Sequence, residues 1–192
     1  REKLGLVTGQ LARIQTTLRE LVTFSRPASD VRTRVSVRDV VDEALGIAKF
    51  YKGGKNRDIA VAVPSELPPL VGVRDQFVQV VFNLVLNAID ATGKGGRIGV
   101  TARAEGNRIV LVVDDDGRGV DPKHRERLFR PYFTTKKHGT GLGLFVIRRI
   151  VEQHGGTVAV ESEPSRGTTF TISLPAAAPT RRSEPLPEEA AT

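Results

Sequence analysis

Two pairs of alternating segments constrain the fold of this chain most strongly. In each pair, apolar and polar side chains alternate with a period of two, and a short connection containing glycine separates the segments, as in a β-hairpin. The pairs are 97–104 with 108–114, and 157–161 with 168–174. A further alternating run at 59–63 predicts another strand. We therefore expect a sheet that contains two hairpins.

The segments between the predicted strands have the spacing of apolar residues that is typical of helices. Ser36, with Asp39 three residues later, resembles a capping box at the start of one helix. Apolar side chains three and four residues apart predict helices over about 74–91 and 141–154, and we expect Gly155 to end the last one. A mixed sheet with helices on one face predicts the α+β class, as a two-layer α/β sandwich.

The first 28 residues have a pattern of their own. Apolar side chains recur in steps of three and four, at Leu4, Val7, Leu11, Ile14, Leu18 and Leu21. This pattern predicts one apolar side of a long helix, which packs either on its own domain or in a separate helical bundle. The linker that follows at 29–35 favours the separate bundle. We therefore expect a helical region over 1–28, the linker, a folded domain over 36–175 and a disordered tail over 176–192, where large apolar groups are scarce.

Composition excludes several classes of function. The 192 residues include no Cys, and the three His lack the spacing of a zinc motif. The net charge of +7 is spread along the chain without a basic stripe of stacking aromatic residues, so nucleic acid is not an expected partner. No stretch approaches the roughly 20 apolar residues of a membrane span. We expect a cytoplasmic location and no membrane contact from this chain, although a full-length protein can be anchored elsewhere.

The predicted helix over 74–91 carries a row of polar side chains on one side. The row consists of Gln76, Gln79, Asn83, Asn87 and Asp90. One interpretation is a solvated helix face. The other is a set of oxygen ligands for Mg²⁺, a hard cation that obtains charge balance from nucleotide phosphates.

Asp115 follows a predicted strand and precedes Gly117 and Gly119. A carboxylate at a strand end can accept a hydrogen bond from an exocyclic amine such as adenine N6, and glycine lets the backbone approach a ligand closely. By themselves these residues are also compatible with a turn or a calcium loop.

Glycines at 139, 141 and 143 open the last predicted helix, just after Lys136 and Lys137. Backbone N–H groups at such a helix start can bind phosphate oxygens. The pattern is neither the dinucleotide fingerprint nor the Walker A sequence.

In this order, the motifs resemble those of the GHKL superfamily, which has the Bergerat ATP-binding fold, and within it those of sensor histidine kinases. The similarity covers roughly residues 36–175. It rests on the N box at 83–88, the G1 box at 115–119, the F box at 129–133, the G2 box at 139–144 and the Gly-Thr-x-Phe motif at 167–170. Residues 11–27 also look like the second helix of the family's dimerisation domain.

The resemblance implies a site for ATP and Mg²⁺. By it, Asn87 coordinates the metal, Asp115 binds adenine N6, and Lys136 contacts phosphate from a mobile lid over about 120–140. It also assigns to ATP binding Asn83, Asp90, Gly117, Gly119, Thr135, Gly139, Thr140, Gly141, Leu142, Gly143, Leu144 and Thr168.

The resemblance further implies phosphotransfer. Family members that hydrolyse ATP have a Glu four residues before the metal-binding Asn, as a base for water; here that position is Asn83, whose amide cannot accept a proton. A histidine kinase instead transfers the γ-phosphoryl group to a His, and then to an Asp of a response-regulator receiver domain, as a homodimer. The family's acceptor His, followed by Glu or Asp, has no counterpart here, so we expect a fragment. The alternative is a regulatory ATP-binding module or scaffold without phosphotransfer.

Two expectations concern structure alone. The family's helix-opening Asp is replaced by Val73, and a lost N-cap costs about 1 kcal/mol, which Asp75 in the first turn partly offsets. We expect Arg118, Arg130, His138 and His154 to be surface residues.

Overall fold

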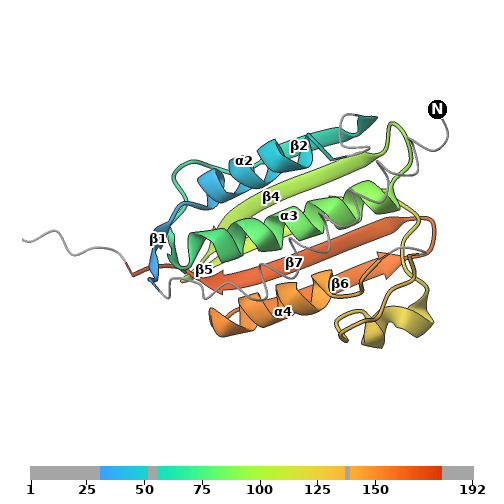
Figure 1. Ribbon diagram of the computed structural model, residues 1–192. Helices are drawn as coiled ribbons and strands as arrows, with labels where there is room; N and C mark the ends of the chain where they lie inside the picture. Colours follow the sequence, from blue (N-terminus) through green and yellow to red (C-terminus); the bar gives the residue numbers. More distant parts are fainter. Residues whose placement is uncertain (1–30, 52–55, 137–138, 179–192) are drawn as a thin grey trace, which may run out of the picture.

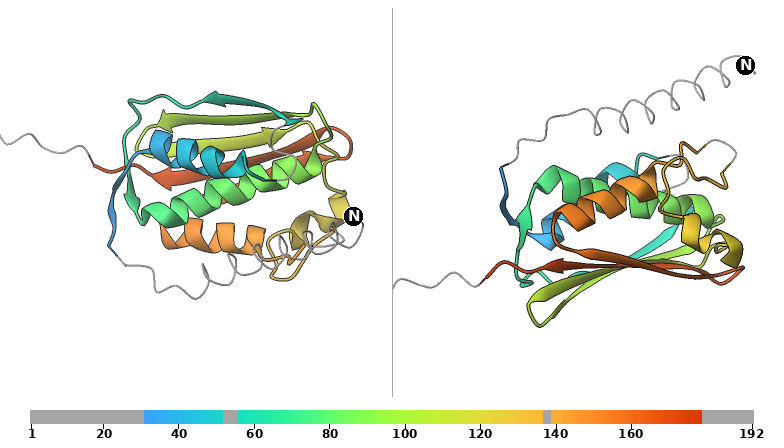
Figure 2. Two further views of the ribbon diagram at one scale, coloured as in Figure 1. Left: turned by 45° about the horizontal axis from the view of Figure 1, so that its top comes forward. Right: turned by 90° about the horizontal axis from the view of Figure 1, so that it is seen from below.

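The computed structural model describes residues 31–51, 56–136 and 139–178. These residues form a two-layer sandwich in which helices cover one face of a sheet (Figures 1 and 2). The predicted helix over 1–28 and the chain beyond residue 178 lie outside the described residues. The separate helical region and the disordered tail therefore stay predictions.

The larger sheet has five strands in the order β2-β4-β5-β7-β6. One hairpin joins β4 (Arg97–Glu105) to β5 (Arg108–Asp115), and the other joins β6 (Thr157–Glu163) to β7 (Gly167–Pro175). β5 and β7 pair antiparallel, whereas β2 (Asp58–Ala62) pairs parallel with β4. Both predicted hairpins and the mixed sheet are confirmed.

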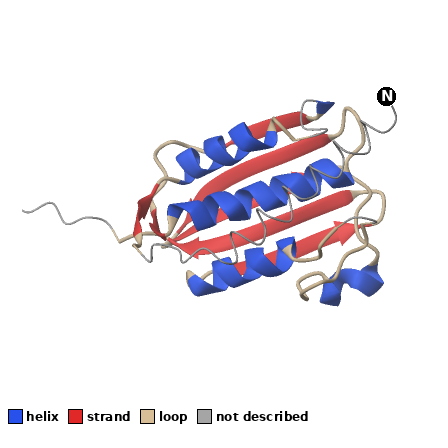
Figure 3. Ribbon diagram, in the orientation of Figure 1, coloured by secondary structure: helices blue, strands red, loops and turns tan. Residues whose placement is uncertain are grey.

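Three α-helices of the described chain lie on one face of this sheet, as Figure 3 shows. They are α2 (Val37–Ala48), α3 (Arg74–Ala91) and α4 (Gly143–Gln153). α3 packs between α2 and α4. A 3-10 helix, η2 (Pro122–Arg127), lies in the segment between β5 and α4. None of the described helices has the length and apolarity needed to cross a membrane.

The core lies between the helices and alternate residues of the strands. Val100 pairs opposite Val113, and Val113 opposite Phe170, so one apolar row crosses three strands on the helix-covered face. Each of these side chains is at most 6% exposed. Burial of a side chain of this size contributes about 1.5–3 kcal/mol, which explains why the period-two alternation sets the register of the strands.

The helix ends follow the local sequence. Ser36 Oγ accepts a hydrogen bond of 3.3 Å from the Asp39 N–H, as the predicted cap requires. Gly155 has φ of +68° at the end of α4, which confirms it as the left-handed terminator. Val73 precedes α3 without a side-chain cap, also as predicted.

His154 corrects the expectation that it is a surface residue. Its side chain is buried, its Nδ1 lies 2.8 Å from the Ile150 carbonyl oxygen, and its Nε2 accepts a hydrogen bond of 3.3 Å from the Val73 N–H. Its ring also packs 4.5 Å from that of Phe77. The imidazole therefore joins the end of α4 to the start of α3. Arg118 and Arg130 are exposed as predicted, whereas His138 lies outside the described residues.

A second, two-stranded sheet extends the domain beyond the boundary predicted at residue 36. β1 (Thr33–Val35) pairs antiparallel with β3 (Leu70–Gly72), so part of the predicted linker is a strand. Ala176 bridges to Leu70, and Ala177 is buried, so the first residues of the predicted tail also pack on the domain. Strands of three residues are too short to show alternation, and their pairing joins distant parts of the chain.

Candidate nucleotide-binding site

The polar row on α3 faces a cationic side chain from the segment between β5 and α4. Lys136 Nζ donates hydrogen bonds to Asn87 Oδ1 at 2.9 Å and to Asp90 Oδ2 at 2.7 Å. Asn83, one turn earlier, is half-buried like Asn87, whereas Asp90 is exposed. Two oxygen atoms one turn apart thus already converge on one cation.

This arrangement also tests whether Mg²⁺ fits the site. A neutral amide oxygen and a carboxylate oxygen are ligands that Mg²⁺ accepts, and the ammonium group of Lys136 occupies the position between them as a stand-in cation. The side chains of the Lys136–Asp90 ion pair are 32% and 41% exposed, so its contribution is at most about 1 kcal/mol. The donor set therefore fits a divalent cation, and the ammonium group is easily displaced.

Asp115 ends β5 as a buried carboxylate, with only 8% of the residue exposed. Burial raises its pKa from the ordinary 3.8 to about 6, while hydrogen bonds from the Gly117 and Thr168 backbone amides limit the rise. For the exposed neighbour Asp116, a hydrogen bond from the Arg97 backbone amide instead lowers the pKa. At neutral pH, Asp115 is therefore an ionised, buried acceptor next to the turn that follows.

The turn after Asp115 packs against the end of α3. The Arg118 N–H donates to the Ala91 carbonyl at 3.2 Å, and a Cβ at Gly117 would lie 2.7 Å from the Ala91 carbonyl carbon and oxygen. Glycine is thus required for this close approach. The contact brings Asp115 to the same end of α3 as Asn87, four residues before Ala91.

The glycine-rich loop has a left-handed residue in its middle. Gly141 has φ of +71°, and a Cβ there would lie 2.4 Å from the Tyr132 carbonyl carbon. This conformation explains why α4 begins at Gly143 and not, as predicted, near residue 141. Thr140 Oγ1 accepts from the Leu142 N–H at 3.3 Å. The next N–H groups, in the first turn of α4, have no acceptor within the helix, which suits them to bind an anion.

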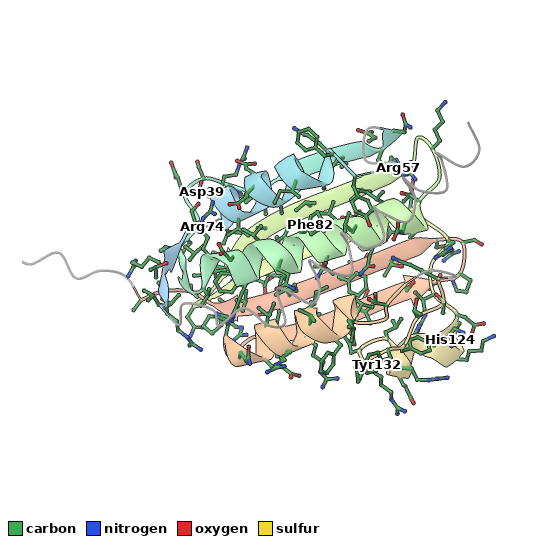
Figure 4. All side chains as sticks on the ribbon, in the orientation of Figure 1. Asp39, Arg57, Arg74, Phe82, His124 and Tyr132 are labelled. Carbon is green, nitrogen blue, oxygen red and sulfur yellow. The ribbon has the colours of Figure 1, made fainter. Side chains whose placement is uncertain are left out.

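The other residues assigned by resemblance lie around these groups. The Gly139 N–H donates to the Lys136 carbonyl at 3.3 Å, and Thr135 is exposed beside Lys136. Leu144 packs partly against the core, and so has a structural role. Figure 4 shows Tyr132 in the same segment, beyond the start of α4.

Two residues near Asp115 were missed by the sequence analysis. Gly167, known only as part of a motif, has φ of +98°, and a Cβ there would lie 1.8 Å from the Asp115 carbonyl oxygen. Ser162 is buried and hydrogen-bonds to Thr168. The register of the second hairpin is the signal that could have found Ser162, because the turn around 164–166 sets it opposite Thr168.

Comparison with known proteins agrees with this geometry. Residues 72–178 match the family model described as histidine kinase-, DNA gyrase B-, and HSP90-like ATPase. The chain belongs to this ATPase family. Among curated members, it is 37% identical over 164 residues to the sensor histidine kinase ZraS of Salmonella typhimurium, a match that covers 85% of this chain and 35% of that protein. The chain thus spans about a third of the length of this relative.

Solved structures of family members have the same fold. The catalytic domain of the histidine kinase ThkA is 31% identical, with a TM-score of 0.68 over 76% of this chain and 96% of that one. A structure of ThkA with the response regulator protein TrrA has a TM-score of 0.73 at 26% identity, over 92% and 51%. Full-length ShkA in complex with AMPPNP has a TM-score of 0.72 at 25% identity, over 93% and 40%. The resemblance to the ATP-binding domain of sensor histidine kinases is confirmed.

Proposed function

We propose that this chain binds Mg·ATP at the end of α3 that carries Asn87 and Asp90. The observation that most supports this is the convergence of both side chains on one ammonium group, next to the turn that presents the buried Asp115. A cation site, a buried acceptor and the start of α4 are what a nucleotide with phosphates and an amino-substituted base requires.

Each group has a distinct task in this proposal. Asp115 accepts a hydrogen bond from the adenine amine, and the first turn of α4 binds phosphate oxygens. Asn87 supplies a neutral oxygen to Mg²⁺, which neutralises phosphate charge when bound. Lys136 leaves Asn87 for a phosphate oxygen, so its charge stays paired.

Phosphotransfer is the reaction that the residues favour. Asn83 has no proton-accepting carboxylate for the activation of water, and the chain contributes mainly positioning and electrostatic stabilisation. The acceptor is a neutral His outside this chain, on the helical region of a homodimer. Its ring nitrogen bonds to the γ-phosphorus as the bond to the β,γ-bridging oxygen breaks, and ADP leaves. The phosphoryl group then passes to an Asp of a response-regulator receiver domain, a partner class that the ThkA–TrrA structure supports.

Thermal unfolding with and without Mg·ATP tests the nucleotide site. At about 100 times the dissociation constant, ligand should stabilise the wild type by about 2.7 kcal/mol. Asp115→Asn should lose most of this gain, measured against its own unliganded baseline. Asp114→Asn is the matched control, because Asp114 is the preceding strand residue and points to the opposite face of the sheet. No gain for the wild type at saturating Mg·ATP would refute the proposal.

Acid-labile phosphate formed from γ-labelled ATP tests the transfer. The full-length parent protein should acquire it on a His, whereas this chain alone should bind Mg·ATP without becoming labelled. A parent that binds Mg·ATP normally yet never becomes labelled would instead support the regulatory module.

A further inference from the structure

A row of three polar side chains crosses the sheet at its Asp115 end. Asp115 on β5 pairs opposite Thr168 on β7, and Thr168 pairs opposite Ser162 on β6. The three residues are 6–8% exposed and lie on the helix-covered face, two positions from the apolar row that includes Val113 and Phe170. Their polar atoms must therefore be satisfied within the site.

The hydrogen bonds of Ser162 have only one possible set of directions. The Gly167 carbonyl oxygen, 2.9 Å from Ser162 Oγ, can only accept, so it takes the single hydroxyl proton of Ser162. The Val120 N–H, also 2.9 Å from Ser162 Oγ, can only donate. Ser162 Oγ has therefore one acceptor position left for Thr168 Oγ1, at 2.9 Å, and Thr168 must be the donor in that bond.

This direction decides what Thr168 can offer a ligand. Its only hydroxyl proton is directed to Ser162, so toward other groups Thr168 Oγ1 can only accept. The neighbouring Asp115 carboxylate is also an acceptor. Two acceptors side by side attract an amino group and repel a carbonyl oxygen that contacts them directly.

We propose that Ser162 is a positioning residue that holds Thr168 as an acceptor, and so makes the site select an amino-purine over a keto-purine nucleotide. The inference rests on the proposed ATP site, which it deepens. Without the Ser162 hydroxyl, the Thr168 hydroxyl can rotate and donate to a keto oxygen. The bond from Val120 is lost as well, but Val120 belongs to the backbone that leads away from Asp115, so that loss weakens both nucleotides alike.

Dissociation constants for Mg·ATP and Mg·ITP test this, because the two nucleotides differ only around the purine 6-position, where ITP has a carbonyl oxygen and a proton on the adjacent N1. The wild type should prefer ATP. Ser162→Ala should reduce the ATP-to-ITP preference about fivefold, the equivalent of one hydrogen bond of about 1 kcal/mol. Thr168→Val should reduce it similarly, and the double variant should show no further reduction, because Ser162 acts through Thr168. Ser162→Thr, which restores the hydroxyl, should restore the preference.

Three other results would overturn either this inference or the proposed function on which it rests. Equal weakening of both nucleotides by Ser162→Ala would overturn the inference and leave Ser162 as a structural anchor of Val120. Equal affinity of the wild type for ATP and ITP would overturn it while the nucleotide site stands. A wild type that binds neither nucleotide would refute the proposed function itself. If Ser162→Ala does not fold, Ser162→Cys takes its place in the comparison, because a thiol is a much weaker donor and acceptor than the hydroxyl.

Discussion

Replacement of Asp115 by Asn should change the stability of the nucleotide-free protein in a direction that becomes more favourable, relative to the wild type, as pH rises. The folded protein raises the pKa of Asp115 from 3.8 to about 6, because burial disfavours the charged form. A raised pKa means that the stability associated with this carboxyl is fully present below pH 3.8 and is lost as pH rises through about 6. A shift of this size corresponds to about 3 kcal/mol at most. Asn, which is uncharged at every pH, does not incur this cost.

Urea unfolding at two pH values measures the effect. Between pH 5 and pH 7.5 the free energy of unfolding of Asp115→Asn should rise relative to that of the wild type by about 1.4 kcal/mol, or about 5 °C in melting temperature. Asp116→Asn is the control, because hydrogen bonds from Arg97 lower the pKa of that exposed carboxyl and its effect is complete below pH 5. A gap between Asp115→Asn and the wild type that stays constant or shrinks with pH would refute the reasoning.

Three further substitutions test the packing around the site by urea unfolding. Gly119→Ala should cost several kcal/mol, because the residue has φ of +65° and a Cβ would lie 1.9 Å from the Glu163 carbonyl oxygen; a loss under about 1 kcal/mol would contradict this. Arg57→Met should lower the free energy of unfolding by about 1–3 kcal/mol, because the guanidinium donates to Thr92 Oγ1 at 2.8 Å and to the Thr92 carbonyl at 2.7 Å, at the end of α3. An unchanged urea midpoint would show that these hydrogen bonds do not stabilise the end of the helix. Val73→Asp should add about 1 kcal/mol by supplying the missing N-cap, and a loss of stability would show that Val73 packs too well to be replaced.

Much of the fold could be predicted because its signals are local. Each hairpin has its alternation and its turn within about twenty residues, and Ser36 and Gly155 each mark a helix end locally. The candidate site could be assembled from motifs because most of them lie at or near the end of a helix or strand. What the motifs do not contain is the distance between them, and the contact of Lys136 with Asn87 joins residues 49 positions apart.

The features that were missed depend on contacts between distant residues. His154 looks like a surface residue at a helix end, and only the approach of Phe77 and Val73 makes it buried. β1 pairs with a strand more than thirty residues later, and neither is long enough to show a pattern. The role of Ser162 depends on hydrogen-bond directions across two strands, which no single segment encodes.

For the proposed Mg·ATP site, the Lys136 contact predicts a form of cooperativity between metal and nucleotide. In the nucleotide-free protein the ammonium group already pairs with Asn87 and Asp90, so a cation that enters must displace it. A bare divalent ion brings no anion to receive the released ammonium group, and nucleotide without metal brings no cation to replace it. Only the complex of the two supplies both charges. Metal and nucleotide should therefore bind with a favourable coupling free energy, each one raising the affinity for the other by the same factor.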